Sequence, residues 1–243
     1  MTPRTALVIV PTYNEHENLP ILTRALMQIP GVSLLVVDDQ SPDGTGAVAD
    51  ALAVEYPGRV EVMHRTGPRG LGRAYLDGIA AALPRPFDVI CQMDSDLSHD
   101  PAQLPALLAA TEHADLVIGS RYVAGGGVVN WPLRRRILSR FANIYIRTVT
   151  RISPRDCTSG YRAWRRTALA SLPFDRIGSD GYSFLVEMLF LAATLRLRTA
   201  EVPITFVERR LGESKLTRGV LIESAITPWR LIGSRETARP TPR

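Results

Sequence analysis

The chain has 243 residues, of which 45% are hydrophobic and 22% are charged. This composition is ordinary for a soluble globular protein and excludes a disordered or fibrous chain, and no segment is apolar over the about 18 residues that a transmembrane helix needs. The net charge of +5 favours an anionic partner, a class that includes phosphates, a membrane surface and nucleic acid.

Strand and helix patterns alternate over residues 1–120. Short apolar runs that end in polar loops predict strands at Ala6–Val10, Ser33–Val37, Val60–His64, Val89–Met93 and Leu116–Ser120. Helical patterns lie between them, at Leu19–Ile29, Thr45–Glu55, Leu71–Leu83 and Ala102–Ala110. This rhythm predicts an α/β fold, a mostly parallel sheet sandwiched by helices.

The remainder of the chain is less regular. Its predicted features are a mobile loop at Gly125–Gly127, a basic helix at Leu133–Thr150, a strand at Tyr161–Trp164, an apolar helix at Tyr182–Leu195, a strand at Ala200–Val207 and an amphipathic segment at Val220–Ile232. We expect one domain over residues 1–233 and a disordered tail, rich in proline and arginine, over residues 234–243.

The two cysteines point to a reducing compartment. Cys91 falls in a predicted core strand and Cys157 in a predicted loop, so we expect free thiols. Residues 1–5 lead directly into the first apolar run, so we expect no signal peptide. Cytoplasm is the expected location.

Two carboxylates, Asp94 and Asp96, follow the fourth predicted strand. Ligands of open α/β sheets bind where strands leave the core, and oxygen ligands suit Mg²⁺ or Mn²⁺ shared with substrate phosphates. A pair of solvated aspartates in a loop would read the same way. The pair therefore gains weight only from the loops around it.

Two further loops are expected at the same edge of the sheet. Tyr13 and Glu15 follow the first strand, and Asp38 and Asp39 end the second. An aromatic ring and carboxylates suit the base and ribose of a nucleotide, although each loop alone also reads as a polar turn before a helix. Three such loops together favour a nucleotide site.

Other common motifs are absent or incomplete. Gly70-Leu71-Gly72 follows a strand, but Tyr75 stands where a dinucleotide fingerprint requires its third glycine. The chain has no P-loop pattern and no histidine spacing typical of zinc. We interpret His99, next to the aspartate pair, as a loop residue and not as a base.

Five motifs in order resemble the family 2 glycosyltransferases, which have the Rossmann-like GT-A fold. These motifs are Pro11–Glu15, Asp38–Gly44, Asp94–His99, Gly119–Tyr122 and Gly212–Lys215. Arg134–Asn143 and Thr158–Arg162 are similar, more narrowly, to the dolichol-phosphate (polyprenol-phosphate) mannose synthases. The resemblance covers about residues 5 to 232 and fits the short form of these enzymes, without a membrane-spanning tail.

The resemblance implies a hexosyltransferase that moves mannose from GDP-mannose to a polyprenyl monophosphate lipid. The reaction would invert the anomeric centre and give β-mannosyl phosphoryl polyprenol and GDP. Mg²⁺ or Mn²⁺ would be the cofactor. The enzyme would act at the cytoplasmic face of a membrane as a peripheral protein, alone or with an integral-membrane partner subunit.

The resemblance also implies roles for individual residues. The guanosine part of GDP-mannose would contact Pro11, Tyr13, Glu15, Val37 and Asp39. The divalent ion would be held by Asp94, Asp96 and Ser98, with the Ser95 backbone close to the nucleotide. Some members of the family carry glutamine where Ser98 stands, and the shorter serine would need a bridging water.

Cationic residues would surround the phosphates. Arg121, Arg209 and Lys215 would stabilise the diphosphate and the acceptor phosphate, together with Asp96 and its ion, and no general base is assigned. The lipid phosphate would be held by Arg135 and Ser139, four residues apart on one helix face.

Three alternatives stay open. A synthase that uses UDP-glucose would share these motifs, because few contacts distinguish two hexoses. A subunit that binds nucleotide sugars without catalysis is a second reading, although the aspartate pair and Lys215 are intact. Nucleic-acid binding would fit the charge but lacks a recognisable module, so we expect no nucleic acid partner.

Overall fold

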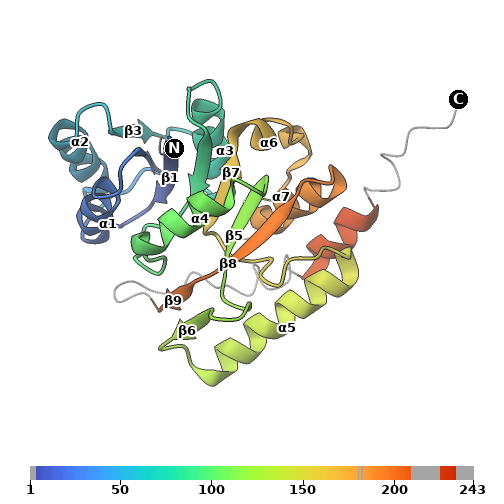
Figure 1. Cartoon of the computed structure of the whole chain (residues 1–243). Helices are drawn as coiled ribbons and strands as arrows, with labels where there is room; N and C mark the ends of the chain where they lie inside the picture. Colours follow the sequence, from blue (N-terminus) through green and yellow to red (C-terminus); the bar gives the residue numbers. More distant parts are fainter. Residues whose placement is uncertain (1–3, 180, 182, 209–224, 234–243) are drawn as a thin grey trace, which may run out of the picture.

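A seven-stranded sheet in the order β3-β2-β1-β4-β7-β5-β8 forms the centre of the computed structural model (Figure 1). The structure describes residues 4–179, 181, 183–208 and 225–233. The strands of this sheet are β1 (Ala6–Thr12), β2 (Val32–Asp38), β3 (Val60–His64), β4 (Val89–Gln92), β5 (Leu116–Ser120), β7 (Arg162–Arg165) and β8 (Thr199–Pro203). Neighbouring strands are parallel except at β7, which is antiparallel to both β4 and β5. The predicted mostly parallel sheet is confirmed.

Helices cover both faces of the sheet. They are α1 (Asn18–Met27), α2 (Thr45–Glu55), α3 (Leu71–Ala82), α4 (Leu104–Ala110), α5 (Leu133–Thr150), α6 (Arg166–Ala170) and α7 (Ser183–Thr194), with single 3-10 turns at Pro101–Gln103 and Phe174–Arg176. Residues 225–233 are also helical. One apolar core lies between the sheet and α1, α2 and α4, and the other lies between the sheet and α3 and α7.

The alternation of side chains along β1 explains why both faces need cover. Leu7 and Ile9 point into one core, while Val8 and Val10 point into the other, and all four are fully buried. A strand that is buried on both faces has a continuous apolar sequence, which is why this run was recognisable.

The glycine run corrects one prediction. Gly127 begins a short strand, β6 (Gly127–Val129), which pairs in parallel with β9 (Thr205–Val207), so the run does not form a mobile loop. A Cβ at Gly126 would lie 2.5 Å from the carbonyl oxygen of Ser120, and Gly125 has a φ of 85°. The glycines therefore allow a tight packed turn.

The predicted strand Ala200–Val207 is two strands. Its first part, β8, belongs to the central sheet and its second part, β9, to the small one. The change of sheet occurs at Ile204, whose N–H donates to Ser120 O at 3.0 Å and whose carbonyl accepts from Gly127 N at 2.9 Å. The segment predicted as one strand thus contributes a strand to each of two sheets.

Gly78 sets the distance between α3 and the sheet, and we predict that Gly78→Ala destabilises the protein by about 1–3 kcal/mol. An added Cβ would lie 2.7 Å from Ile9 Cγ2 and 3.1 Å from Val37 Cγ2, so helix and strand would have to move apart. Gly127→Ala is the control, because nothing lies within 4 Å of its Cβ position. Equal urea midpoints for the two variants would contradict this account of the packing.

Candidate active site

The carboxyl ends of β1, β2 and β4 lie at one edge of the central sheet. β1 pairs in parallel with β2 on one side and with β4 on the other, so the loops that follow these strands are neighbours. The sheet thus brings together the three polar loops that the sequence predicted to share a site. Ligands of open α/β sheets bind outside this edge.

Each of the three loops contains a non-glycine residue in the left-handed backbone region. These residues are Asn14, Gln40 and Leu97, with φ values of 60°, 61° and 61°. Such conformations cost about 1–3 kcal/mol each and persist where surrounding contacts fix them. Leu97 has no polar side chain to bond locally with its own backbone, so its neighbours must hold the loop after β4.

Asp94 and Asp96 stand in that loop. Asp96 is buried, and its Oδ1 accepts the N–H of Ser98 at 3.1 Å. The Asp94 side chain is 30% exposed, and its Oδ1 accepts the hydroxyl of Tyr75 at 3.4 Å. A Cβ at Gly160 would lie 3.1 Å from Asp94 Oδ1, so a larger residue there would crowd the carboxylate.

His99 supports the loop after β4 that contains Asp94. Its Nδ1 accepts the N–H of Asp94 at 3.2 Å, and its ring stacks on Tyr161 and meets Phe206 edge-on. Burial lowers the pKa of His99, which keeps the ring neutral at pH 7. Since Nδ1 is occupied by a backbone N–H, the ring acts as a support for Asp94, in agreement with its interpretation as a loop residue.

The ends of β1 and β2 hold the first part of the predicted nucleotide pocket. Pro11 and Val37 are buried partners in the register of β1 and β2. Asp39 is buried beside them, where its Oδ2 accepts the N–H of Gly70 at 2.8 Å and its Oδ1 pairs with the guanidinium of Arg65. Both oxygens of Asp39 are therefore bonded within the protein.

Tyr13 and Glu15 line the same edge, and both are half-buried. The guanidinium of Arg69 lies 4.7 Å from the centroid of the Tyr13 ring. Glu15 accepts a hydrogen bond from the Asn18 amide at 2.8 Å. An aromatic ring with a cation over its face forms a stacking surface of the kind that nucleobases use.

Arg121, directly after β5, forms a buried bidentate ion pair with Asp156. Nε donates to Oδ2 at 2.7 Å, Nη2 donates to Oδ1 at 2.6 Å, and the backbone N–H of Arg121 also donates to Oδ2, at 2.9 Å. Burial alone would raise the pKa of Asp156, but the charge of Arg121 holds it below its ordinary value. Both groups are therefore ionised.

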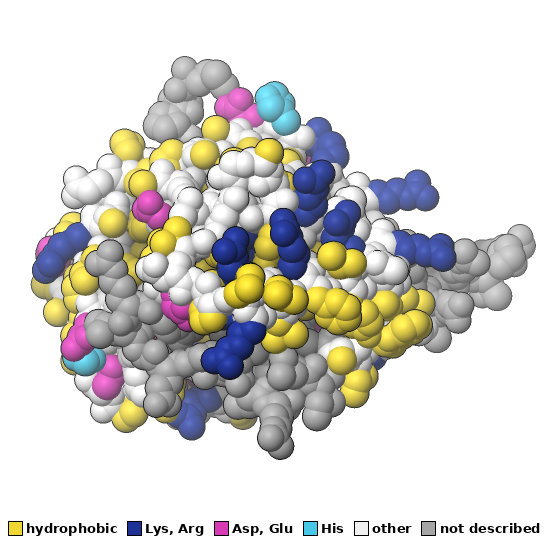
Figure 2. All heavy atoms as spheres, turned by 90° about the horizontal axis from the view of Figure 1, so that it is seen from below, with side chains coloured by type: hydrophobic (Ala, Val, Ile, Leu, Met, Phe, Trp, Pro, Cys, Tyr) yellow, Lys and Arg dark blue, Asp and Glu magenta, His cyan; other side chains and the backbone are white. Residues whose placement is uncertain are grey.

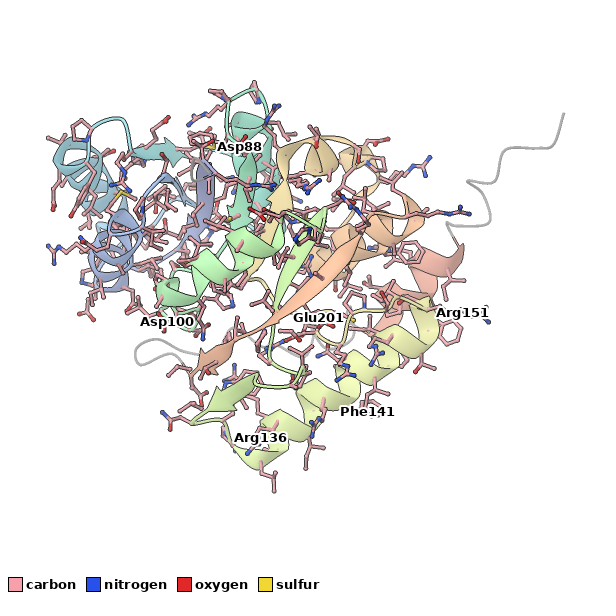
Figure 3. All side chains as sticks on the ribbon, in the orientation of Figure 1. Asp88, Asp100, Arg136, Phe141, Arg151 and Glu201 are labelled. Atoms are coloured by element: carbon pink, nitrogen blue, oxygen red, sulfur yellow. The ribbon has the colours of Figure 1, made fainter. Side chains whose placement is uncertain are left out.

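The turn that contains Asp156 is fixed by a second arginine. Arg162 is fully buried and donates to the carbonyls of Cys157, Ser159 and Leu185 at 3.0, 2.9 and 2.7 Å. Burial lowers the pKa of Arg162 to about 10. From the other side, Glu201 on β8 (labelled in Figure 3) accepts the N–H of Asp156 at 2.9 Å. The turn that places Gly160 against Asp94 is thus rigidly held.

The predicted acceptor residues lie on one flank of α5, one turn apart. Arg135 forms an ion pair with Glu208, and both side chains are half-buried. The Tyr122 hydroxyl donates to Ser139 Oγ at 2.7 Å. The structure therefore places Arg135 and Ser139 together, as the sequence predicted from their spacing.

Trp131 lies between the two predicted phosphate sites. Its ring centroid is 4.2 Å from the guanidinium of Arg135 and 5.5 Å from that of Arg121. Phe206 on β9 packs edge-on against the same ring. One aromatic group thus contacts a cation from each site.

The opposite flank of α5 is apolar and exposed. Figure 2 shows, on this lower face of the molecule, a band of hydrophobic side chains bordered by arginines. Between 50% and 69% of each of these side chains is exposed: Leu133, Ile137, Leu138, Phe141, Ile144 on α5, and Ile226 and Trp229 in the helix of residues 225–233. Arg136 and Phe141 are labelled on α5 in Figure 3.

Sequence reasoning did not assign every contact of the site. Arg209 and Lys215 lie outside the described residues. Asp156, Trp131 and Glu208 received no role, because their partners are distant in the sequence. A buried arginine at a strand end requires an acid, which was the available signal for Asp156.

The aspartate pair fits a divalent ion that takes most of its ligands from a substrate. Among the described residues, no group of three or more histidine, cysteine, aspartate or glutamate side chains converges as a complete metal site. Two carboxylates that share an ion with phosphate oxygens and water match the coordination habit of Mg²⁺, and of ions that substitute for it.

An open sheet with acidic strand ends, and with cations opposite them, is the architecture of GT-A glycosyltransferases. The chain belongs to glycosyl transferase family 2, whose family model matches residues 7–172. It is therefore an enzyme of the glycosyltransferase class, as the motifs predicted.

Two bacterial relatives match almost their whole length. An undecaprenyl-phosphate mannosyltransferase of Micrococcus luteus is 49% identical over 236 residues, which cover 96% of this chain and 97% of that protein. A polyprenol monophosphomannose synthase of Mycolicibacterium smegmatis is 48% identical over 242 residues, which cover 98% of this chain and 91% of that protein.

A solved structure shares the fold at lower identity. Glucosyl-3-phosphoglycerate synthase from Mycobacterium tuberculosis, in complex with Mn²⁺ and UDP-glucose, superposes with a TM-score of 0.66 and 20% identity, over 98% of this chain and 81% of that one. The likeness supports the GT-A assignment of the fold.

The buried pair generates a stability prediction. Asp156→Asn should destabilise the protein by about 3–5 kcal/mol, because it leaves the Arg121 charge buried without a counter-ion. Glu61→Gln is the control; its ion pair with Arg85 is half-exposed and should be worth less than about 1 kcal/mol. Denaturant unfolding measures both, and similar losses would show that the Arg121 pair has no special cost.

Proposed function

We propose that this glycosyltransferase moves mannose from GDP-mannose to a polyprenyl monophosphate and inverts the anomeric centre. The observation that carries the proposal is that Trp131 contacts both Arg121, the cation proposed for the donor diphosphate, and Arg135, the cation proposed for the acceptor phosphate. Near-complete alignment with two relatives named for mannosyl transfer to such lipids supports it.

Charge repulsion is the main obstacle to this reaction. A phosphate nucleophile must approach a sugar diphosphate, and two unit charges 4 Å apart repel by about 4 kcal/mol at an effective dielectric of 20. Arg121 on the donor side and Arg135 on the acceptor side would offset this repulsion. Arg209 and Lys215, outside the described residues, are proposed to add to the same field.

Asp94 and Asp96 would hold a divalent ion, Mg²⁺ or Mn²⁺, against the donor diphosphate, with buried Ser98 behind them. When bound, such an ion stabilises the charge that develops on departing GDP. The protein's own contribution is to hold both carboxylates in place, through the Ser98 N–H on Asp96 and His99 on the Asp94 backbone.

No side chain needs to act as a general base. The acceptor is a phosphate monoester with a second pKa of about 6, so it is already ionised at pH 7. Direct attack on an α-linked donor produces a β-mannosyl phosphate. UDP-glucose as the donor is the second candidate, and the mannosyl names of the relatives favour GDP-mannose.

We propose that the apolar flank of α5 and the helix of residues 225–233 rest on the cytoplasmic face of a membrane. The two helices form one surface, because Trp229 Nε1 donates to the Tyr145 hydroxyl at 2.8 Å and that hydroxyl donates to Ala225 O at 2.6 Å. Apolar side chains bordered by arginines suit an anionic lipid surface.

In the part of the chain that the structure describes, no helix is long and apolar enough to cross a membrane. Both cysteines are buried free thiols, as expected in a reducing compartment. An integral-membrane partner that covers the same flank is the alternative anchor.

The donor and metal assignment predicts metal-dependent transfer from GDP-mannose. With polyprenyl phosphate and Mn²⁺, label from GDP-mannose should enter the lipid phase, and Asp96→Asn should lower the rate on the order of a hundredfold. Asp50→Asn, on the exposed side of α2, is the matched control and should behave like the wild type. If label is transferred from UDP-glucose and not from GDP-mannose, the donor assignment is wrong. An unchanged rate in Asp96→Asn would contradict the assignment of the metal site.

The membrane assignment predicts binding to anionic vesicles. The double variant Ile137→Ser, Phe141→Ser should sediment with phosphatidylglycerol vesicles much less than the wild type, because it removes two exposed apolar anchors. Val54→Ser changes an apolar residue on α2 that is even more exposed, at 82%, and should have no effect. If the double variant binds vesicles as the wild type does, this flank is not the docking surface.

A further inference from the structure

Glu208 occupies the place that the acceptor phosphate is proposed to take. Its carboxylate pairs with Arg135, with 32% of the Glu208 side chain and 27% of the Arg135 side chain exposed. Arginine binds carboxylates and phosphates through the same planar fork. The carboxylate is thus a chemical stand-in for the phosphate on this side chain.

The backbone of Glu208 is fixed, so its side chain is the part that can leave. Its N–H donates to Val129 O at 3.1 Å, which extends the pairing of β9 with β6. The preceding N–H, of Val207, donates to Ser98 O at 3.2 Å. Rotation of one half-exposed side chain is enough to release Arg135.

A phosphate and Glu208 cannot share Arg135 without cost. Two anions within a few ångströms repel strongly in a partly desolvated site. An anion that binds Arg135 therefore either breaks the ion pair with Glu208 or bears this repulsion, and the loss is subtracted from its affinity.

The surroundings of the ion pair still lack one partner. Among the described residues, Trp131 Nε1 is a buried donor without a hydrogen-bond acceptor. A buried unsatisfied donor costs free energy that a nearby acceptor recovers. The indole ring centroid lies 4.2 Å from the Arg135 guanidinium, so this unsatisfied donor belongs to the same cluster as the ion pair.

We propose that Glu208 is the resident anion of the acceptor site, which the lipid phosphate displaces from Arg135. The inference rests on the proposed function, because it takes Arg135 as the acceptor's ligand. The exchange sets a threshold for binding: a phosphate monoester with two charges exceeds it, while monoanionic phosphodiester headgroups of the surrounding membrane are held off. Glu208 is therefore a specificity-determining residue for the acceptor.

The test is equilibrium binding of geranyl monophosphate, a soluble short-chain probe, by calorimetry without a donor. Glu208→Gln keeps the shape of the side chain and removes its charge, so the dissociation constant should fall about fivefold. Glu61→Gln makes the same change in another Arg–Glu pair, with Arg85, and should leave binding unchanged. Arg135→Ala should abolish binding.

The displacement of Glu208 should also change the kinetics of mannosyl transfer. In the transfer assay, Glu208→Gln should lower KM for the acceptor and leave KM for GDP-mannose unchanged. An unchanged or higher dissociation constant in Glu208→Gln would overturn the proposal, since Glu208 would then only orient Arg135. If the wild type, Glu208→Gln and Arg135→Ala all bind the probe equally or not at all, the acceptor assignment itself fails, and this inference fails with it.

Discussion

The buried ion pair between Arg121 and Asp156 is the contact on which the site depends. It joins the end of β5 to the turn that contains Gly160, and that turn lies against Asp94. The same turn is tied to α5, because Cys157 N–H donates to the Asn143 side chain at 2.7 Å. Loss of the pair would remove one link between the end of β5 and this turn, and leave an uncompensated charge in the interior.

A second constraint is that the site must bind the phosphate groups of its substrates and also release them. The described cations near the site already have internal partners: Arg121 has Asp156, Arg135 has Glu208 and Arg65 has Asp39. The pairs of Arg121 and Arg65 are buried, whereas the pair of Arg135 is partly exposed and is the one that a ligand can exchange. β9 connects this exchange to the metal loop, since Phe206 packs on His99 and Val207 bonds to Ser98.

Local patterns predicted much of the fold. The bounds of β3, β5, α2 and α5 match the sequence prediction, because charged or turn-forming residues flank each of them. The antiparallel insertion of β7 between β4 and β5, and the small sheet of β6 and β9, depend on pairing between distant segments that no local pattern encodes. The acidic edge was recognisable because its residues directly follow predicted strands. The partnership of Asp156 and the position of Glu208 depend on distant segments and were not recognisable. The roles of individual site residues stay predictions.

The most direct test of the account is the anomeric configuration of the product. GDP-α-mannose, a polyprenyl monophosphate and the protein would be combined with Mn²⁺, and the isolated glycolipid examined by proton and phosphorus NMR. The account predicts a mannosyl phosphate in the β configuration, which requires the donor, the acceptor phosphate and direct displacement to be as proposed. An α-linked product would contradict the displacement, and a product in which mannose is not joined to the lipid phosphate would contradict the acceptor site.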